Sequence, residues 1–295
     1  MFAKMAIKNI FRQKRRSIFT SIGMIFGAVL VSFSVSLTDG TYQTLIGTFT
    51  RNQSGHIQVH KKGYLESPSI YKSIKQTSAV EQILSKEKRI RSFSPRVYTE
   101  GLAFFNKKST GVSIKGISSE FEKKVTGLNR RWDLKDDFLD DSERSVIISK
   151  YLSKLLQIDR GSQIIIISQG ADGSIANDMF EVKGVVDEKR HGLSPRELYM
   201  PIGTLQEYLS MGSSVHEYAV LLENIEDSRR VSMDLNTKLE DVTKARSEPW
   251  QVILKDFYKA MLMDKQGTTV SLGIIIFIVA LHVFLQKYKY HQGYL

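Results

Sequence analysis

The sequence predicts a membrane protein in which two transmembrane helices flank one large α+β domain. Residues 17–38 and 266–286 contain no Asp, Glu, Lys or Arg and are rich in large apolar side chains. As α-helices, these segments reach about 30 Å, the thickness of the hydrocarbon core of a bilayer. Residues 39–265 mix short strand and helix patterns without the regular alternation of a doubly wound sheet. These observations place most of the chain on one side of a membrane.

The first 16 residues, MFAKMAIKNIFRQKRR, predict a basic amphipathic segment on the cytoplasmic side. Apolar side chains fall near one face of a helix and basic side chains mostly on the other, which suits a short helix in the membrane interface. A simple basic flank explains the same residues equally well.

Residues 17–38 are interpreted as a retained membrane anchor. The alternative is a cleaved signal peptide, whose apolar region runs about 7–15 residues and ends at small residues. This segment is longer and ends in SVSLTDGTYQ. Within it, Gly23 and Gly27 form a G-x-x-x-G pair, the spacing that lets two helices pack closely. The pair is a predicted helix-packing site, although the same spacing also arises by chance in apolar segments.

The distribution of basic residues predicts the topology. The chain carries a net charge of +11, and eight of its 42 basic residues lie beside the two apolar segments, where no acidic residue is found. We expect these eight at the membrane interface: Lys4, Lys8, Arg12, Lys14, Arg15, Arg16, Lys287 and Lys289. Because Lys and Arg favour the cytoplasmic side, both termini are predicted to be cytoplasmic, with a short tail over residues 287–295. The basic flanks are expected to attract anionic lipid headgroups.

The same count argues against a nucleic-acid partner. Once the eight flanking residues are set aside, 34 basic residues remain against all 31 acidic residues of the chain. The large domain is therefore close to neutral and lacks the basic surface of a nucleic-acid-binding domain.

The predicted domain over residues 39–265 reads as strands and short helices. Alternating apolar residues predict strands, and apolar residues three and four apart predict helices. The expected strands cover residues 56–60, 96–106, 112–117, 146–148, 163–168, 180–186, 198–202 and 217–223. The expected helices cover residues 78–88, 118–122, 149–157, 203–209, 227–239 and 256–264, the last continuing into the second span. Ser78 with Glu81 predicts an N-terminal capping box, and Asp172-Gly173 predicts a hairpin turn.

No catalytic, cofactor-binding or metal-binding site is predicted. The chain has no cysteine and no G-x-x-x-x-G-K-[ST], G-x-S-x-G or H-E-x-x-H pattern. His56 and His60 would lie about 13 Å apart on one strand face, too far to share a metal. His191 and His216 stand alone. The aspartates of the charged loop over residues 129–141 are interpreted as solvated charges: Asp136, Asp137, Asp140 and Asp141. A surface enzyme would have Asp140 and His191 as its best candidates.

Several stretches, taken in order, resemble the FtsX/MacB-like permeases of ABC transporters, and most closely their lipoprotein-releasing, LolC/LolE-like branch. They are AIKNIFRQKRRSIFTSIG, SGHIQVHKKGY, VIISKYLSKLLQIDRGSQIIIISQGADGSIANDMFEVKGVVD, LYMPIGTLQEYL and SLGIIIFIVAL. The resemblance covers almost the whole chain to about residue 283. The ordered set carries it, since no single motif is diagnostic.

The resemblance implies a MacB-like periplasmic core with a porter-like and a Sabre-like part, held in the bacterial inner membrane. It also implies a mechanotransmitter: a separate cytoplasmic ATPase dimer closes on ATP, and the movement reaches periplasmic domains that handle a lipoprotein, a lipid or another export substrate. The implied partners are this ATPase subunit, a second permease copy or paralogue, a periplasmic or outer-membrane partner and the lipid bilayer. The chain itself is expected to have no enzymatic activity and no cofactor.

The end of the chain departs from the family pattern. Members continue past the second span with an E-R-[TS]-x-E-[IF]-G-like segment that meets the ATPase and with two further spans, whereas this chain reads HVFLQKYKYHQGYL. We therefore expect the N-terminal part of such a permease, truncated after the second transmembrane helix or completed by a second polypeptide. Because these last residues do not match the segment that meets the ATPase in the family, they do not imply coupling to an ATPase. The alternative is a membrane-anchored periplasmic binding or scaffold protein without ATPase coupling.

Overall fold

The computed structural model describes residues 14–128, 143–187 and 194–292, and the chain divides into two compact units. The first unit contains the chain up to residue 46 and from residue 256 onward, and the second contains residues 47–255. Two long helices build the first unit. A continuous sheet with covering helices builds the second. The predicted loop with Asp136, Asp137, Asp140 and Asp141 lies outside the described residues, as does His191.

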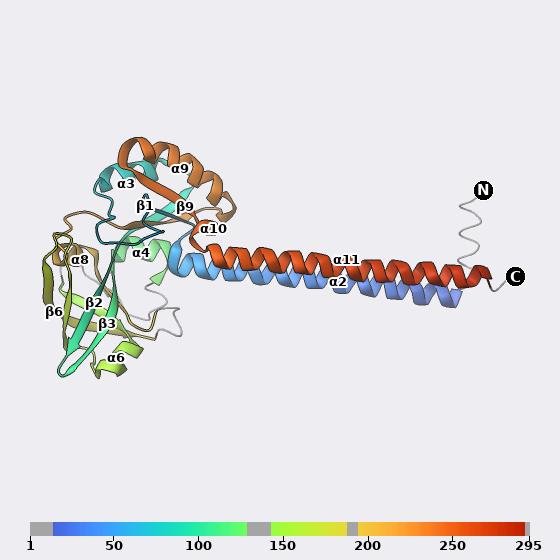
Figure 1. Cartoon of the computed structure of the whole chain (residues 1–295), viewed down its shortest axis with the longest axis horizontal. Helices are drawn as coiled ribbons and strands as arrows, with labels where there is room; N and C mark the ends of the chain where they lie inside the picture. Colours follow the sequence, from blue (N-terminus) through green and yellow to red (C-terminus); the bar gives the residue numbers. More distant parts are fainter. Residues whose placement is uncertain (1–13, 129–142, 188–193, 293–295) are drawn as a thin grey trace. The chain divides into compact units, whose positions relative to one another are not determined.

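The first unit consists of α2 (Lys14–Phe49) and α11 (Lys255–Gln292), which run side by side in opposite directions (Figure 1). Among the described residues, two helical segments are long and apolar enough to cross a membrane, Ser21–Phe49 and Lys255–Leu281. Their large apolar side chains are mostly exposed. Apolar surface of this extent is stable against lipid or another protein rather than in water. The expected continuation of the helix over residues 256–264 into the second span is confirmed.

A short π-helical turn, η1 (Thr50–Ser54), precedes the first strand of the second unit. Gly55 follows it with a positive φ of 72°, a conformation that favours glycine. A Cβ at this position would lie 2.8 Å from Val220 O, and the next residue, His56, donates its N–H to the same carbonyl at 2.8 Å. The turn therefore needs glycine both for its backbone angle and for the close approach of the neighbouring strand.

Nine strands of the described residues form one sheet in the order β3-β7-β4-β6-β5-β2-β8-β1-β9. The strands are β1 (Ile57–Lys61), β2 (Ile90–Phe105), β3 (Lys108–Ile117), β4 (Ser145–Ser149), β5 (Gln163–Gln169), β6 (Ile175–Val186), β7 (Glu197–Pro201), β8 (Glu217–Leu222) and β9 (Ala245–Pro249). An added pairing between β3 and β2 closes β2, β3, β7, β4, β6 and β5 into a barrel. The pairs β3–β7 and β4–β6 are parallel, and the others are antiparallel.

Strand β2 belongs to both halves of the second unit. Its second half pairs with β3 and β5 in the barrel, and its first half pairs with β8, which continues through β1 to β9. We call the part formed by the first half of β2 with β8, β1 and β9 the open sheet. One continuous strand thus joins the barrel to the open sheet.

Helices cover both parts. Two of them, α3 (Thr77–Lys86) and α9 (Ser228–Thr243), pack against each other beside the open sheet (Figure 1). On β2 and β8 lies α4 (Ser119–Val125), while α6 (Lys150–Leu156) and α8 (Ile202–Tyr208) pack on the barrel. The short elements η2 (Ile225–Asp227) and α10 (Trp250–Ile253) precede α9 and α11.

The barrel and the open sheet share one hydrophobic core. Ile57 of the open sheet belongs to the same buried cluster as Ile114 and Phe180 of the barrel. Helix α8 closes onto the barrel at Gly116, where a Cβ would lie 2.8 Å from Leu205 Cδ2. Burying a side chain of this size contributes roughly 2 kcal/mol. The continuous core makes the second unit a single folding body.

The structure confirms the predicted mixed α+β architecture, but the predicted capping box at Ser78 is wrong. Helix α3 begins at Thr77, with Gln76 at the N-cap position and no side-chain cap. The Val80 N–H donates to Gln76 O at 3.3 Å, so Ser78 already lies inside the first turn. By contrast, the predicted turn at Asp172-Gly173 does join β5 to β6, with Gly173 at a φ of 86°.

The sequence patterns do not predict two of the observed strand segments. The first half of β2 contains Pro95, which interrupts a strand pattern, but among the described strands this half has β8 as a neighbour on one side only. Proline is tolerated there because it removes no ladder hydrogen bond on the free side. Strand β9 reads ARSEP and lies at the edge of the sheet, where charged residues and proline are common. Asn236 of α9 bonds both the N–H and the C=O of Ser247, so α9 covers this edge.

Candidate functional site

A polar contact joins the two long helices of the first unit. The Asp39 carboxylate and the Lys265 ammonium group form a salt bridge at 2.7 Å, and the Tyr42 hydroxyl donates a hydrogen bond to Asp264. We call these four residues the clasp. Asp39 and Lys265 border the two predicted spans on the side of the large domain. Because the clasp pairs these two residues, the C-terminal end of the first predicted span lies beside the N-terminal end of the second.

The basic flanks lie at the opposite ends of the same helices. Arg16 precedes Asp39 by 23 residues on α2, and Lys287 follows Lys265 by 22 residues on α11. At 1.5 Å per residue, these separations are about 35 and about 33 Å. The backbone positions of Lys14, Arg15 and Lys289 lie at these same helix ends. Lys4, Lys8 and Arg12 lie outside the described residues. The helices thus separate clasp and basic flanks by about one bilayer thickness.

The glycine pair of α2 has no close neighbour in the described chain. No described atom outside the helix comes within 4 Å of a Cβ built at Gly23 or Gly27. Phe26, on the same helix, is 62% exposed. The predicted role of the two glycines in close helix packing therefore stays a prediction.

A buried set of charges lies where the barrel meets the open sheet. We call Arg96, Lys115, Glu122 and Glu217 the junction cluster. Arg96 of β2 is fully buried and makes a two-pronged contact with Glu122 of α4, with Nη2–Oε1 at 2.6 Å and Nε–Oε2 at 3.1 Å. Its Nη1 donates to Glu217 of β8 at 3.0 Å. Lys115 of β3 lies with Nζ 5.4 Å from the centre of the Tyr98 ring.

Arg96 favours the charged form of both carboxylates in the junction cluster. Burial would raise the pKa of Glu122, but the guanidinium of Arg96 and its hydrogen bonds hold that pKa at about 2. Burial raises the pKa of Glu217 despite the opposing effect of Arg96. Burial also lowers the pKa of Lys115, and the like charge of Arg96 adds to this effect. Arg96 is therefore the group on which both carboxylates depend for their charge.

The arrangement suits a structural tie rather than acid–base chemistry. Its members come from the shared strand, the barrel, the open sheet and α4, and the main carboxylate partner of Arg96 is held in its charged form. Removing one partner of such a buried set costs about 3–5 kcal/mol. Sequence reasoning missed the cluster because its residues lie far apart along the chain. The available signal was Glu217, which opens a strand, EYAVLL, that is buried throughout.

Three histidines of the second unit are buried, and burial lowers the pKa of each. Burial lowers the pKa of His56 and of His60 to about 4. His216 accepts the Tyr98 N–H at Nδ1, and its Nε2 lies 3.2 Å from Ile70 O, so its ring uses both nitrogens. The ring of Tyr64 stacks between His60 and His216, with centroid distances of 6.0 and 5.6 Å. The described residues contain no group of three or more His, Cys, Asp or Glu placed to hold a metal ion.

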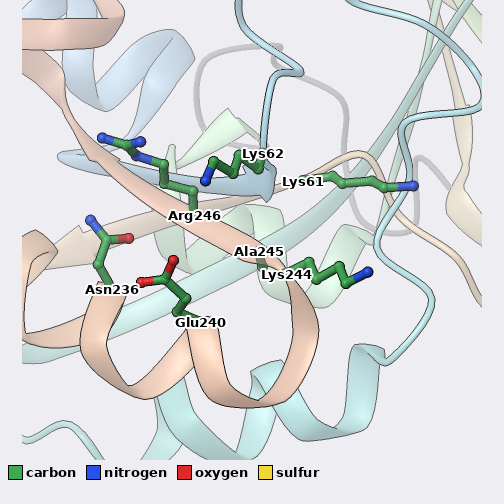
Figure 2. Close-up of a pocket in the computed structure, with 7 residues that line it drawn as sticks. All are labelled: Lys61, Lys62, Asn236, Glu240, Lys244, Ala245 and Arg246. Atoms are coloured by element: carbon green, nitrogen blue, oxygen red, sulfur yellow. The ribbon is translucent and has the colours of Figure 1, made fainter.

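A wide pocket of about 610 Å³ opens beside β9 and the end of α9 (Figure 2). Its lining residues are Lys61, Lys62, Asn236, Glu240, Lys244, Ala245 and Arg246. Figure 2 shows that Lys61 and Lys244 point away from Lys62 and Arg246. Arg246 is also paired with Glu248 at 2.6 Å. The basic side chains of this pocket, which we call the β9 pocket, do not converge on one point.

A second pocket, of about 380 Å³, lies at the C-terminal end of α4. We call it the α4 pocket. Its lining residues are Arg51, His56, Arg91, Lys123, Lys124, Val125, Thr126, Gly127, Leu221, Leu222 and Glu223. Val125 and Leu221 belong to a small buried apolar cluster and form an apolar floor. Four cationic side chains therefore surround a pocket in which Glu223 is the one acidic residue of the described lining.

The fold and these features define a class of protein: two candidate membrane helices flank one mixed α/β domain. Residues 17–238 match the family described as the MacB-like periplasmic core domain. The chain belongs to this family and, with it, to the FtsX/MacB permeases. The architecture that the resemblance implied is thereby confirmed at the level of the periplasmic core.

The relatives are distant. The macrolide export ATP-binding/permease protein MacB of Aggregatibacter actinomycetemcomitans is 22% identical over 275 residues, which are 90% of this chain and 41% of that protein. This chain thus spans about two-fifths of the length of that relative.

Two solved structures are similar to the chain. The periplasmic region of MacB from Actinobacillus actinomycetemcomitans shows 17% identity and a TM-score of 0.48, covering 72% of this chain and 97% of that one. The extracellular domain of the ABC-type transporter YknZ from Gram-positive bacteria shows 17% identity and a TM-score of 0.45, covering 65% and 98%.

Proposed function

We propose that this chain is part of an ABC transporter permease that transmits movement across the bacterial inner membrane. One observation carries the proposal: the family match begins at the start of the first predicted span and continues past β8 of the second unit to residue 238. The clasp supports it, because it joins the two helices where the predicted spans leave the bilayer. In this proposal both termini are cytoplasmic and the α/β domain is periplasmic.

The proposal assigns ATP hydrolysis to a separate cytoplasmic ABC ATPase subunit. Closure of that subunit would move α2 and α11, and the movement would reach the open sheet and then the barrel through the shared strand β2. A second permease copy or a paralogue would pack against the face of α2 that carries Gly23 and Gly27. That face has no close neighbour in the described chain, which supports a partner there.

The finer proposal places the chain in the lipoprotein-releasing, LolC/LolE-like branch. Its support is the ordered set of sequence stretches, including SGHIQVHKKGY and LYMPIGTLQEYL. The periplasmic domain would then hand a lipoprotein or lipid to a periplasmic or outer-membrane partner. The relative named for macrolide export indicates that the wider family also includes proteins with other cargo.

Affinity purification of the full chain from native membranes tests the permease proposal. We expect the eluate to contain a cytoplasmic protein with a phosphate-binding G-x-x-x-x-G-K-[ST] loop and to hydrolyse ATP. The control is the same tag on an unrelated inner-membrane protein of similar abundance. An eluate with the chain but without ATPase activity would contradict the permease proposal and favour a membrane-anchored scaffold.

A further inference from the structure

The α4 pocket combines features that an anion site needs. Arg51 and Arg91 are exposed at its rim, and neither has an acidic partner among the described residues. Lys123 adds a third cation without such a partner in the described chain, while Lys124 pairs with Glu120 at 3.0 Å in an exposed contact. Planar guanidinium groups bind phosphate with two parallel hydrogen bonds, and lysine adds a compact positive charge.

His56 supplies a ring N–H donor among the residues that line the same pocket. The residue is only 6% exposed, and its Nδ1 accepts the N–H of Leu222 at 3.2 Å. The proton of the neutral ring is therefore on Nε2. No described residue accepts a hydrogen bond from this nitrogen, so it can donate to a ligand in the pocket. Arg51 lines the same pocket, and its positive charge adds to the effect of burial in lowering the pKa of His56.

The end of α4 does not oppose an anion. The last carbonyl groups of a helix carry partial negative charge. Here Lys124 O accepts the Ser92 hydroxyl at 3.2 Å, and Glu122 O accepts both the N–H and the hydroxyl of Thr126. Two of the last four carbonyl groups are thus paired, and, among the described residues, four basic side chains against one acidic side chain line the pocket.

We propose that the α4 pocket binds a phosphate group, presented either as a free anion or as the headgroup of a phospholipid. The phosphate oxygens would accept hydrogen bonds from His56 Nε2 and from Arg51 and Arg91, with Lys123 balancing the remaining charge. The volume leaves room for a glyceryl or second phosphate substituent beyond one phosphate. The site requires only the second unit and is independent of any ATPase partner.

Titration calorimetry on the full chain in a non-ionic detergent tests the site, with inorganic phosphate and glycerol 3-phosphate as probes. Removing two charged donors weakens a phosphate contact by about 10- to 100-fold. We expect this loss in the double variant Arg51→Gln/Arg91→Gln. We expect Glu223→Gln to bind a few-fold more tightly, because a negative charge is lost from the lining. The matched control is Lys62→Gln/Lys244→Gln in the β9 pocket, which should bind like the wild type (Figure 2).

Native mass spectrometry of the chain with phosphatidylglycerol separates the two sources. A bound lipid that is lost in Arg51→Gln/Arg91→Gln supports a headgroup, and binding of the soluble probes without such a lipid supports a free anion. The proposal is overturned if neither binds, if the double variant binds as the wild type does, or if citrate competes as well as phosphate. All the substituted residues are exposed, so loss of folding does not obscure the result.

Discussion

At the scale of single residues, Arg96 links the two buried carboxylates of the junction cluster. It is fully buried, and it is the cation bonded to both Glu122 and Glu217. Buried ion pairs need not add stability relative to an apolar core, but removing one member leaves uncompensated charge. Arg96 therefore matters because it compensates two buried carboxylates. A substitution that removes its charge leaves them uncompensated and is expected to destabilise the fold.

The first prediction concerns that change. Arg96→Met should lower the free energy of unfolding by about 3–5 kcal/mol, measured by chemical denaturation of the full chain in detergent. The control is Arg89→Met, which removes the partly exposed pairs with Glu87 and Asp234 and should cost about 1 kcal/mol or less. Adding Glu122→Gln to Arg96→Met should recover part of the loss. Equal small effects at both arginines would contradict the account of the junction cluster.

The second prediction is a dependence of stability on pH. The pKa of His60 falls from 6.5 to about 4 on folding because burial disfavours the charged ring, so the unfolded chain binds its proton first as pH falls. This contribution is complete above pH 6.5 and is lost progressively toward pH 4. Between pH 6.5 and 5 the loss is about 2 kcal/mol.

Unfolding curves at several pH values between 7.5 and 5 test this expectation. His60→Phe keeps an aromatic ring to stack on Tyr64 but cannot titrate, so its stability should fall less steeply with acid than that of the wild type. Parallel pH profiles for the two proteins would show that His60 is not buried in its neutral form.

At the scale of elements, the turn before β1 fixes how the first strand enters the sheet. Gly55 should tolerate no side chain, because its φ is 72° and a Cβ there would lie 2.8 Å from Val220 O. We predict that Gly55→Ala costs about 2 kcal/mol or more in the free energy of unfolding. Gly111→Ala in β3 is the control, since its Cβ would meet no described atom within 4 Å. If Gly111→Ala lowers the free energy of unfolding as much as Gly55→Ala does, the role proposed for Gly55 in this turn is wrong.

Local patterns identified most elements of the second unit. QIIIIS predicts β5, and SKYLSKLLQ predicts α6. The structure adds the N-cap of α6, where the Ser149 hydroxyl accepts the Leu152 N–H. Elements that depend on neighbours escaped these patterns. ARSEP becomes a strand because β1 pairs with it and Asn236 covers its edge. The same limit explains the α4 pocket, whose cations come from separate segments that only the fold assembles.

At the scale of the whole molecule, the proposed topology rests on two helices that separate the clasp from the basic flanks by similar distances. The clasp and the basic flanks are separated by about 35 Å on α2 and about 33 Å on α11, which is close to the thickness of a bilayer. The apolar composition of the spans, the positive flanks and the family match were all accessible from sequence. The pairing of Asp39 with Lys265 could not be predicted from the sequence, because these residues are more than two hundred positions apart.

The central claim is that both termini share one compartment and that the second unit occupies the other. Because the chain has no cysteine, single cysteines can be introduced at Lys107 in the β2–β3 turn and at Lys289 beyond the second span. A membrane-impermeant maleimide applied to intact spheroplasts should label Lys107→Cys, and it should label Lys289→Cys only after the membrane is opened. Labelling of both variants, or of Lys289→Cys alone, in intact spheroplasts would contradict the account.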